Sequence, residues 1–362
     1  MKHTHTLLTA LIMLPLAAIH VVEAQVATGF DVRDYGAVGD DATDNTIAFS
    51  RCLKAVVDAG GGRVTIPSGV FRGRMIIPPV SQPSPSWITV EIIGEREPTH
   101  VFGTIGSFPL QNHGSIVKCL AESGPAVISA AQPVKPLYGT FSAVNIVLKN
   151  LDVRTYDNPG IGGIDLKNAM QCKLENVFIN TGVYNVLASR PTHGTSGLIT
   201  PAANNAAWTV LRNITVTGYH DGIVVNEHTD GDNIVVGSNI NGLNFAFAHH
   251  ASRFARVCSC RNVNTVTVSG AHGFSIEQLD IEQPGPAQTD KQNEWQATAT
   301  DVKDSNNLGV ADINYWVVIG NVGARDVFTK QGGATIQCRR IGSPRNFETK
   351  NPGVPAERPS AK

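Results

Sequence analysis

The stretch Leu148-Lys149-Asn150-Leu151-Asp152-Val153 decides the fold, because the chain repeats its pattern. The pattern is an apolar residue, a charged residue, a side-chain amide, a second apolar residue, any residue and a third apolar residue. Further copies begin at Leu174, Leu211 and Ile276. The successive amide positions are 26, 37 and 65 residues apart, and the longest gap holds weaker copies around Asn239 and Asn262. A pattern that recurs at such distances indicates one structural unit used many times.

Repeats of this length with loop insertions are typical of the coils of a parallel β-helix. The sequence therefore predicts an all-β protein, a single-stranded right-handed parallel β-helix in which each coil adds a strand to sheets running along the solenoid. Stacked coils place equivalent residues about 4.8 Å apart. Asn150, Asn176, Asn213 and Gln278 are therefore expected to form a ladder of amide hydrogen bonds rather than a ligand site.

The competing all-β interpretation is a propeller or an immunoglobulin-like sandwich. Either would require blade-length repeats or a series of hairpin turns between adjacent strands. The single Asn241-Gly242 does not make such a series.

The two ends of the chain differ from its body. Residues 1–24 have the form of a signal peptide, with Lys2, an apolar run from Leu7 to Ile19 and a small-residue stop at Ala24. We expect a secreted protein, extracellular or periplasmic, and no membrane span, because no second apolar stretch approaches the roughly 20 residues that a spanning helix needs. We expect residues 29–341 to form the β-helix domain and residues 342–362 to form a flexible tail.

Residues 30–71 predict a cap for the first coil. Thr43-Asp44 offers an N-cap, and the helix that follows should end at Gly60-Gly61-Gly62. Its expected apolar positions are Ile47, Phe49, Leu53, Val56 and Val57. A solenoid needs such an element to cover its first hydrophobic rung.

Composition excludes several partners and sites. A formal net charge of -1 provides no basic surface for nucleic acid. Six cysteines are too few for a disulfide scaffold in a chain of 362 residues. Cys172 and Cys258 each precede an amide position by four residues, so they are expected on equivalent edges of coils too far apart for a disulfide, as free buried thiols.

The N-terminal segment resembles that of polygalacturonase-like and pectate-lyase-superfamily proteins. The matching elements are Asp34-Tyr35-Gly36-Ala37-Val38-Gly39-Asp40, Thr43-Asp44, Gly60-Gly61-Gly62 and Ile66-Pro67-Ser68-Gly69. The resemblance implies the pectin lyase fold and a polysaccharide partner, bound or cleaved along the flank of the helix. It leaves the reaction open, because hydrolases, lyases, epimerases and phage tailspikes begin similarly.

Polygalacturonase-type hydrolases carry three Asp carboxylates, a Gly-His-Gly and an Arg-Ile-Lys on successive coils. The resemblance matches Asp221, in Tyr219-His220-Asp221-Gly222, to the first Asp, and His272, in Ala271-His272-Gly273, to the histidine. The Asp pair and the Arg-Ile-Lys are missing. An inverting hydrolase needs two carboxyl groups about 6.5–9.5 Å apart.

A shifted alignment gathers other titratable residues on neighbouring coils, plausibly along one groove. They are Glu227, Asp230, Asp232, His249, His250, Arg253 and His272. In a catalytic interpretation Asp230 or Asp232 is acid or base with a histidine partner, and Arg253 binds a substrate carboxylate. The further substrate-binding residues expected on this groove are His249, His250 and Glu227. In a lyase interpretation Asp230, Asp232 and Glu227 hold Ca²⁺, and Arg253 or Arg256 abstracts the proton.

In the third interpretation Thr229-Asp230-Gly231-Asp232-Asn233 is a polar turn between coils, and His249-His250 is a solvated edge. The function expected from the sequence is an extracellular polysaccharide-active enzyme that cleaves glycosidic bonds of a uronate-containing polymer by hydrolysis or elimination. The alternative is a non-catalytic β-helix that binds glycan or serves as an adhesin or structural spike. No cofactor is expected apart from the Ca²⁺ of a lyase.

Overall fold

The computed structural model describes residues 29–80, 87–98, 114–121, 123–132, 144–155, 160–181, 195–202, 208–247, 252–260, 262, 264–268, 273–282, 294–299, 310–317, 325–330 and 335–341. The predicted signal peptide (residues 1–24) and the predicted tail (residues 342–362) lie outside these residues. Within them, no helix combines the length and the apolar composition needed to cross a membrane.

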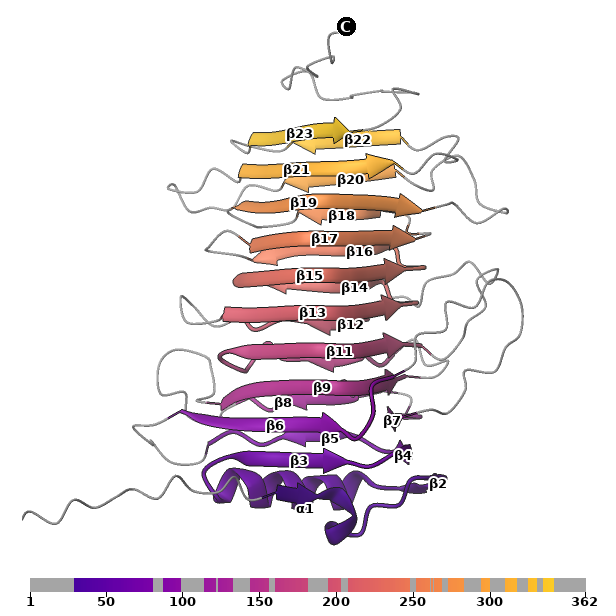
Figure 1. The fold of residues 1–362 in the computed structure, drawn as a ribbon, viewed down its shortest axis with the longest axis vertical. Helices are drawn as coiled ribbons and strands as arrows, with labels where there is room; N and C mark the ends of the chain where they lie inside the picture. Colours follow the sequence, from indigo (N-terminus) through magenta and orange to yellow (C-terminus); the bar gives the residue numbers. More distant parts are fainter. Residues whose placement is uncertain are drawn as a thin grey trace, which may run out of the picture.

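Two sheets of parallel strands run the length of the molecule (Figure 1). Sheet A has 14 strands: β1 (Gly29–Asp31), β2 (Asp40–Asp44), β3 (Gly62–Ile66), β4 (Gly69–Arg72), β6 (Ile88–Gly94), β7 (Ser115–Lys118), β9 (Val144–Arg154), β11 (Cys172–Asn180), β13 (Trp208–Thr217), β15 (His228–Gly237), β17 (Ser252–Cys260), β19 (Gly273–Glu282), β21 (Val310–Val317) and β23 (Thr335–Ile341). Sheet B has nine: β5 (Met75–Ile77), β8 (Ile128–Ala130), β10 (Ile164–Asp165), β12 (Ser196–Ile199), β14 (Asp221–Asn226), β16 (Asn241–Phe247), β18 (Asn264–Val268), β20 (Glu294–Ala299) and β22 (Arg325–Lys330).

The chain crosses from sheet A to sheet B and back in each coil, so strands adjacent in a sheet are not consecutive in sequence. Adjacent coils bring Cys172 beside Thr209, Trp208 beside His228, and Asp230 beside Arg253. This is the predicted right-handed parallel β-helix. The sandwich alternative is excluded, because such a sandwich requires antiparallel pairs.

Four consecutive strands of sheet A, β9, β11, β13 and β15, each bend at an asparagine. Asn150, Asn176, Asn213 and Asn233 have φ values of 56°, 55°, 53° and 55°, in the left-handed region that asparagine tolerates better than most residues. The Nδ2 atoms of Asn176, Asn213 and Asn233 donate to the Oδ1 atom of the preceding asparagine at 3.0, 2.9 and 2.7 Å. The predicted ladder is confirmed for Asn150, Asn176 and Asn213.

The ladder ends at Asn233 in β15, and two predictions about its continuation are wrong. Arg256 pairs with Gln278 and directly precedes Val257, the partner of Ile234, so it stands between Asn233 and Gln278. A guanidinium has no acceptor atom, so the chain of amide bonds cannot reach Gln278. Asn239 and Asn262 are not copies of the pattern either: they lie in the turns that follow β15 and β17, where Asn262 Oδ1 accepts from the Asn239 backbone N–H at 2.8 Å.

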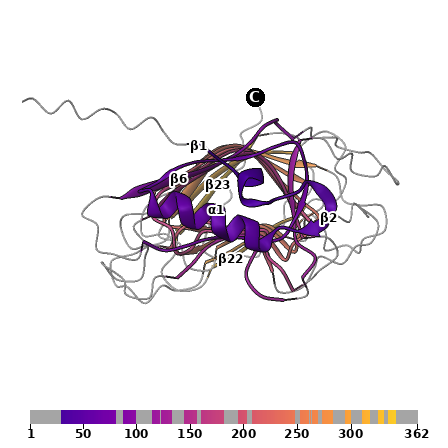
Figure 2. The same ribbon diagram turned by 90° about the horizontal axis from the view of Figure 1, so that it is seen from below.

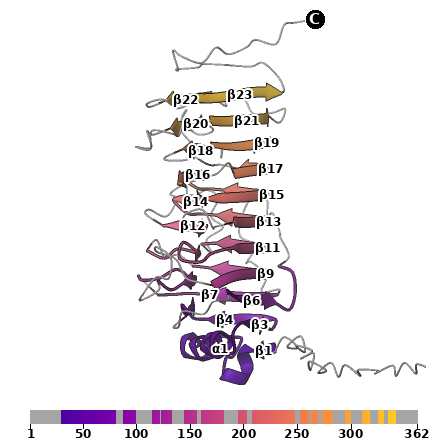
Figure 3. The same ribbon diagram turned by 90° about the vertical axis from the view of Figure 1, so that its left-hand side faces the viewer.

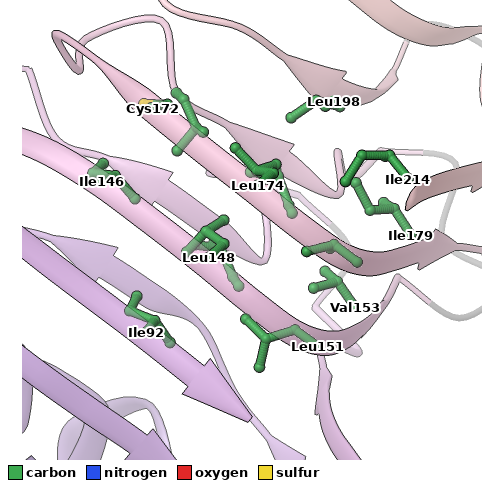
Figure 4. Packing of buried hydrophobic residues seen from close by; sticks show 14 of the residues in the cluster. Ile92, Ile146, Leu148, Leu151, Val153, Cys172, Leu174, Ile179, Leu198 and Ile214 are labelled. Carbon is green, nitrogen blue, oxygen red and sulfur yellow. The ribbon is translucent and has the colours of Figure 1, made fainter. Parts of the chain in front are cut away.

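Apolar side chains from successive coils stack inside the solenoid (Figure 4). Leu148, Leu174 and Leu211 lie in register before the bend, and Leu151, Val177 and Ile214 lie in register after it. All six are fully buried. Full burial of one such side chain contributes about 1.5–3 kcal/mol, so the recurring apolar positions of the pattern supply the core.

Helix α1 (Thr46–Asp58) covers the first end of the solenoid (Figure 2). It buries Phe49, Cys52, Leu53 and Val56. Ile47 is 67% exposed, contrary to the prediction, because it falls off the stripe that these four residues define. The N-cap of the helix also lies later in the chain than predicted: Thr43-Asp44 belongs to β2, and the N-cap residue is Asn45.

Cys52, Cys119 and Cys172 are free, buried thiols, whereas Cys258 is only half-buried, contrary to the prediction. Cys172 and Cys258 do not occupy equivalent edges, contrary to the prediction. Cys172 lies beside Ile146 before the bend, whereas Cys258 lies beside Val235 after it. The expected equivalence failed because Asn262 lies in the turn after β17, whereas Asn176 lies inside β11.

Candidate functional site

One outward surface of sheet A carries most of the described residues that the sequence singled out. We call it the pre-bend face: the outward side chains that precede the bending position in β9, β11, β13, β15 and β17. Side chains alternate along a strand, so Thr209, Leu211, Thr229 and Gly231 are buried while their neighbours point outward. The outward residues of β13, β15 and β17 on this face include Trp208, Arg212, His228, Asp230, Asp232 and Arg253.

The interpretation of residues 229–233 as a polar turn is wrong. They lie inside β15, which pairs with β13 on one side and β17 on the other. Asn233 takes the left-handed conformation that makes such a segment look like a turn, but it does so as a member of the ladder. Asp230 and Asp232 therefore sit on a fixed sheet surface.

Trp208, His228 and Asp230 form a contiguous group on this face. The Trp208 and His228 rings have centroids 4.5 Å apart with an interplanar angle of 40°. His228 Nε2 lies 3.7 Å from Asp230 Oδ1. That carboxylate oxygen is buried and has no hydrogen-bond donor among the described residues, while the Asp230 side chain as a whole is 38% exposed.

Sequence reasoning missed Trp208 and His228 as site residues. A signal was present: each precedes its ladder asparagine by five residues, Trp208 before Asn213 and His228 before Asn233. Residues at the same offset from the ladder meet side by side, and their register confirms it.

Asp232 belongs to a row of alternating charges. Lys149 pairs with Glu175 at 3.0 Å, Arg212 lies in register between Glu175 and Asp232, and Arg256 Nε contacts Asp232 Oδ1 at 2.9 Å. The hydrogen bond from Arg256 holds the pKa of Asp232 below its usual value, against the desolvation that would raise it. Because the Asp232 carboxylate is engaged by the Arg256 guanidinium, the geometry favours a structural role for Asp232.

Arg253 lies beside Asp230 on the neighbouring strand and is exposed. It forms no ion pair within the part of the chain that the structure describes. Its guanidinium can therefore bind an external carboxylate with two parallel hydrogen bonds.

Asp221 lies on the other sheet. It starts β14 of sheet B, away from β15 (Figure 3). Its Oδ1 accepts hydrogen bonds from Asn241 Nδ2 at 2.8 Å and Asn244 Nδ2 at 3.3 Å, and His220 Nδ1 is 3.3 Å from its Oδ2. Asp221 therefore does not share a face with Asp230 and Asp232.

Glu227 occupies the corner between β14 and β15, with φ 44° and no exposed surface. Buried polar groups surround it: Ser252 Oγ donates to its carbonyl at 3.0 Å, and Thr229 Oγ1 donates to the Asn226 carbonyl at 3.2 Å. A polymer on the surface cannot contact a fully buried side chain, so substrate binding by Glu227, as predicted, does not fit this geometry.

The remaining predicted residues cannot be placed. His249 and His250 fall between β16 and β17 in sequence, and His272 between β18 and β19; all three lie outside the described residues. Within the described residues no three His, Cys, Asp or Glu side chains form a group able to hold a metal ion. The predicted Ca²⁺ ligands Asp230, Asp232 and Glu227 are thus not brought together.

Comparison with known proteins places the fold and the family. A 43-residue stretch is 46% identical to the mannuronan C5-epimerase AlgE3 of Azotobacter vinelandii, covering 12% of this chain and 2% of that protein. The structure resembles the DFA-IIIase of Arthrobacter chlorophenolicus A6, solved without its lid in complex with GF2, with a TM-score of 0.52, 12% identity and coverage of 90% and 92% of the two chains. ORF18 of Geobacillus virus E2 matches with a TM-score of 0.43 and 12% identity over 89% of this chain and 62% of that chain.

This chain therefore spans a small fraction of AlgE3 and 62% of the viral chain. At 12% identity, the likeness to the DFA-IIIase shows the fold alone. The family model described as rhamnogalacturonase A/epimerase, pectate lyase-like, matches residues 29–272, more than half of the chain. With its parallel β-helix and asparagine ladder, this chain belongs to the rhamnogalacturonase A/epimerase family of pectate lyase-like proteins.

Proposed function

We propose that this chain is a secreted enzyme that cleaves a uronate-containing polysaccharide by β-elimination on the pre-bend face. The observation that carries the proposal is the placement of one accessible carboxylate, Asp230, between an imidazole, His228, and a guanidinium without an ion-pair partner among the described residues, Arg253. The family description, which names a rhamnogalacturonase and an epimerase, supports a uronate polymer as the substrate class.

In this mechanism Arg253 binds the uronate carboxylate and neutralises it, which acidifies the proton on the adjacent carbon. Asp230 removes that proton, with His228 beside it to stabilise the charge that shifts during the transfer. The electron pair left on carbon forms a double bond to the next ring carbon. The glycosidic oxygen leaves with its bonding electrons and takes up a proton from water.

Elimination fits the described residues better than inverting hydrolysis. Hydrolysis requires a second carboxyl group across the scissile bond. Of the other predicted carboxyl groups, Asp221 lies on sheet B, Asp232 is paired with Arg256, and Glu227 is buried. By the resemblance, His272 stays a predicted catalytic residue.

The test is a product assay on a polysaccharide panel that includes rhamnogalacturonan, polygalacturonate and mannuronan, with and without Ca²⁺. Elimination yields a product with ultraviolet absorbance from the new double bond, whereas hydrolysis yields reducing ends without it. We expect Asp230→Asn to lower kcat by at least 100-fold, the scale of general-base catalysis. The matched control is Asp232→Asn, two residues along the same strand, which should leave kcat within about two-fold. Reducing ends without absorbance, or equal losses in the two variants, would overturn the elimination mechanism.

The second candidate is a non-catalytic glycan-binding β-helix. The separation of Asp221 from Asp230 and Asp232 onto different sheets favours it, because the carboxylate that the resemblance matched to the first catalytic Asp does not face the same bound polymer as Asp230 and Asp232. Retained binding on a glycan array, with no product from any polymer, would select this alternative.

Within the enzyme proposal, a His272→Ala variant with unchanged turnover would remove His272 from the catalytic set.

A further inference from the structure

We infer that Trp208 and His228 form a stacking subsite for a sugar ring, and that the subsite and Arg253 together bind one short segment of an acidic polysaccharide. This inference rests on the proposed function, because it uses the same face. It adds a subsite that the sequence did not predict and defines what that subsite contacts.

The first support is the exposure and the orientation of the indole. Trp208 is 51% exposed although it belongs to a sheet strand, and its ring is held against His228 on the next coil. A fixed, partly exposed aromatic ring offers an apolar face at little cost in conformational entropy. A pyranose has a complementary face of C–H groups, whereas its hydroxyl groups point outward around the ring.

The second support is the arrangement of polar groups beside this platform. His228 contacts Asp230, and Asp230 lies in register with Arg253. An aromatic surface bordered by a few hydrogen-bonding groups is the composition of a site that fixes the orientation of a small ligand. The Asp230 carboxylate can accept from sugar hydroxyl groups, and Arg253 can bind a carboxylate.

The third support is the separation of the two backbone positions that carry the platform and the guanidinium. Trp208 and Arg253 are separated by two strand spacings, about 10 Å along the solenoid, and by two residues, about 7 Å along the strand. A short segment of one polysaccharide chain can span that separation, with one ring on Trp208 and the carboxylate of another sugar of the same segment at Arg253. Asp230 then lies between them, where the proposed reaction takes place.

Trp208 is thereby a binding residue. Removal of the indole should weaken the binding of the substrate equally in the ground state and in the transition state. A loss of uniform binding raises KM and leaves kcat unchanged.

The experiment measures affinity by calorimetry for tetrasaccharides of galacturonate and mannuronate, and for cellotetraose as a neutral probe, at a temperature where turnover is negligible. Trp208→Ala should bind the best acidic probe at least ten-fold more weakly than the wild type, which corresponds to about 1.4 kcal/mol. Trp208→Phe, which keeps an aromatic face, should recover most of that loss. Trp87→Ala is the matched control, because Trp87 is 49% exposed and directly precedes β6 of the same sheet.

Arg253→Ala should weaken binding of the acidic probes at least ten-fold without affecting cellotetraose. In turnover, Trp208→Ala should raise KM about ten-fold with kcat within two-fold. A wild type that binds and cleaves normally, with Trp208→Ala no weaker than Trp87→Ala, would overturn the subsite and leave the proposed function intact. A wild type that neither binds nor cleaves any probe or polymer would overturn both.

Discussion

Replacing Asn176 tests the asparagine ladder most directly. Its Nδ2 donates to Asn150 Oδ1 at 3.0 Å, and its Oδ1 accepts from Asn213 Nδ2 at 2.9 Å. Asn176→Ala removes both hydrogen bonds, each worth about 0.5–1.5 kcal/mol. It also places an alanine at φ 55°, which costs roughly 1–2 kcal/mol. The free energy of unfolding should therefore fall by about 2–5 kcal/mol.

Asn176→Gly separates the two contributions. Glycine adopts the left-handed conformation without strain, so only the hydrogen bonds and some chain entropy are lost, and its stability should lie between those of the wild type and the alanine variant. Urea denaturation followed by far-ultraviolet circular dichroism gives both values. An alanine variant within about 0.5 kcal/mol of the wild type would contradict a stabilising ladder. A glycine variant at least as unstable as the alanine variant would contradict the backbone part of the reasoning.

Two further predictions concern charge. Asp152 pairs with Arg154 at 2.6 Å, and both side chains are 5% exposed. Asp152→Ala should therefore lower the free energy of unfolding, measured by urea denaturation, by about 3–5 kcal/mol. Asp232→Asn, which breaks the exposed pair with Arg256, should lower it by less than about 1 kcal/mol, and equal losses in the two variants would refute this reasoning. Backbone hydrogen bonds from Thr43 and Ala42 lower the pKa of Asp40 to about 2, and Arg256 lowers that of Asp232. Because these carboxylates titrate lower in the folded state, their contribution is present above the unfolded pKa of about 3.9 and is lost as pH falls through the folded value. Stability should decline from about pH 4 to pH 2, more weakly in Asp40→Asn, and identical acid profiles would argue against a role for Asp40.

The fold followed from the sequence because its signal is local. Leu148, Leu174 and Leu211 recur with an amide two positions later, and stacked coils bring these equivalent residues side by side. Where the pattern weakens, prediction failed. Gly231 replaces the first apolar residue in the coil of Asn233, so a ladder member looked like part of a turn.

The site depended on information that the sequence does not display. Asp221 and Asp230 are nine residues apart, yet the corner at Glu227 sends them to different sheets. In the sequence Asp232 looked equivalent to Asp230, and only the structure distinguishes them. Asp232 is paired with Arg256, whereas Asp230 lies beside Arg253, which is exposed and has no ion-pair partner among the described residues.

By itself the sequence determined the solenoid, most of its ladder and the capping helix, because each arises from repeated or contiguous residues. Only the tertiary structure decided which side chains meet across coils. Successive coils place equivalent residues 26, 37, 20 and 23 positions apart between β9 and β17, so the pairing of Trp208 with His228 and of Asp230 with Arg253 depends on loop lengths and strand register. Contacts between strands 4.8 Å apart are set by that register, which no single segment of the chain encodes.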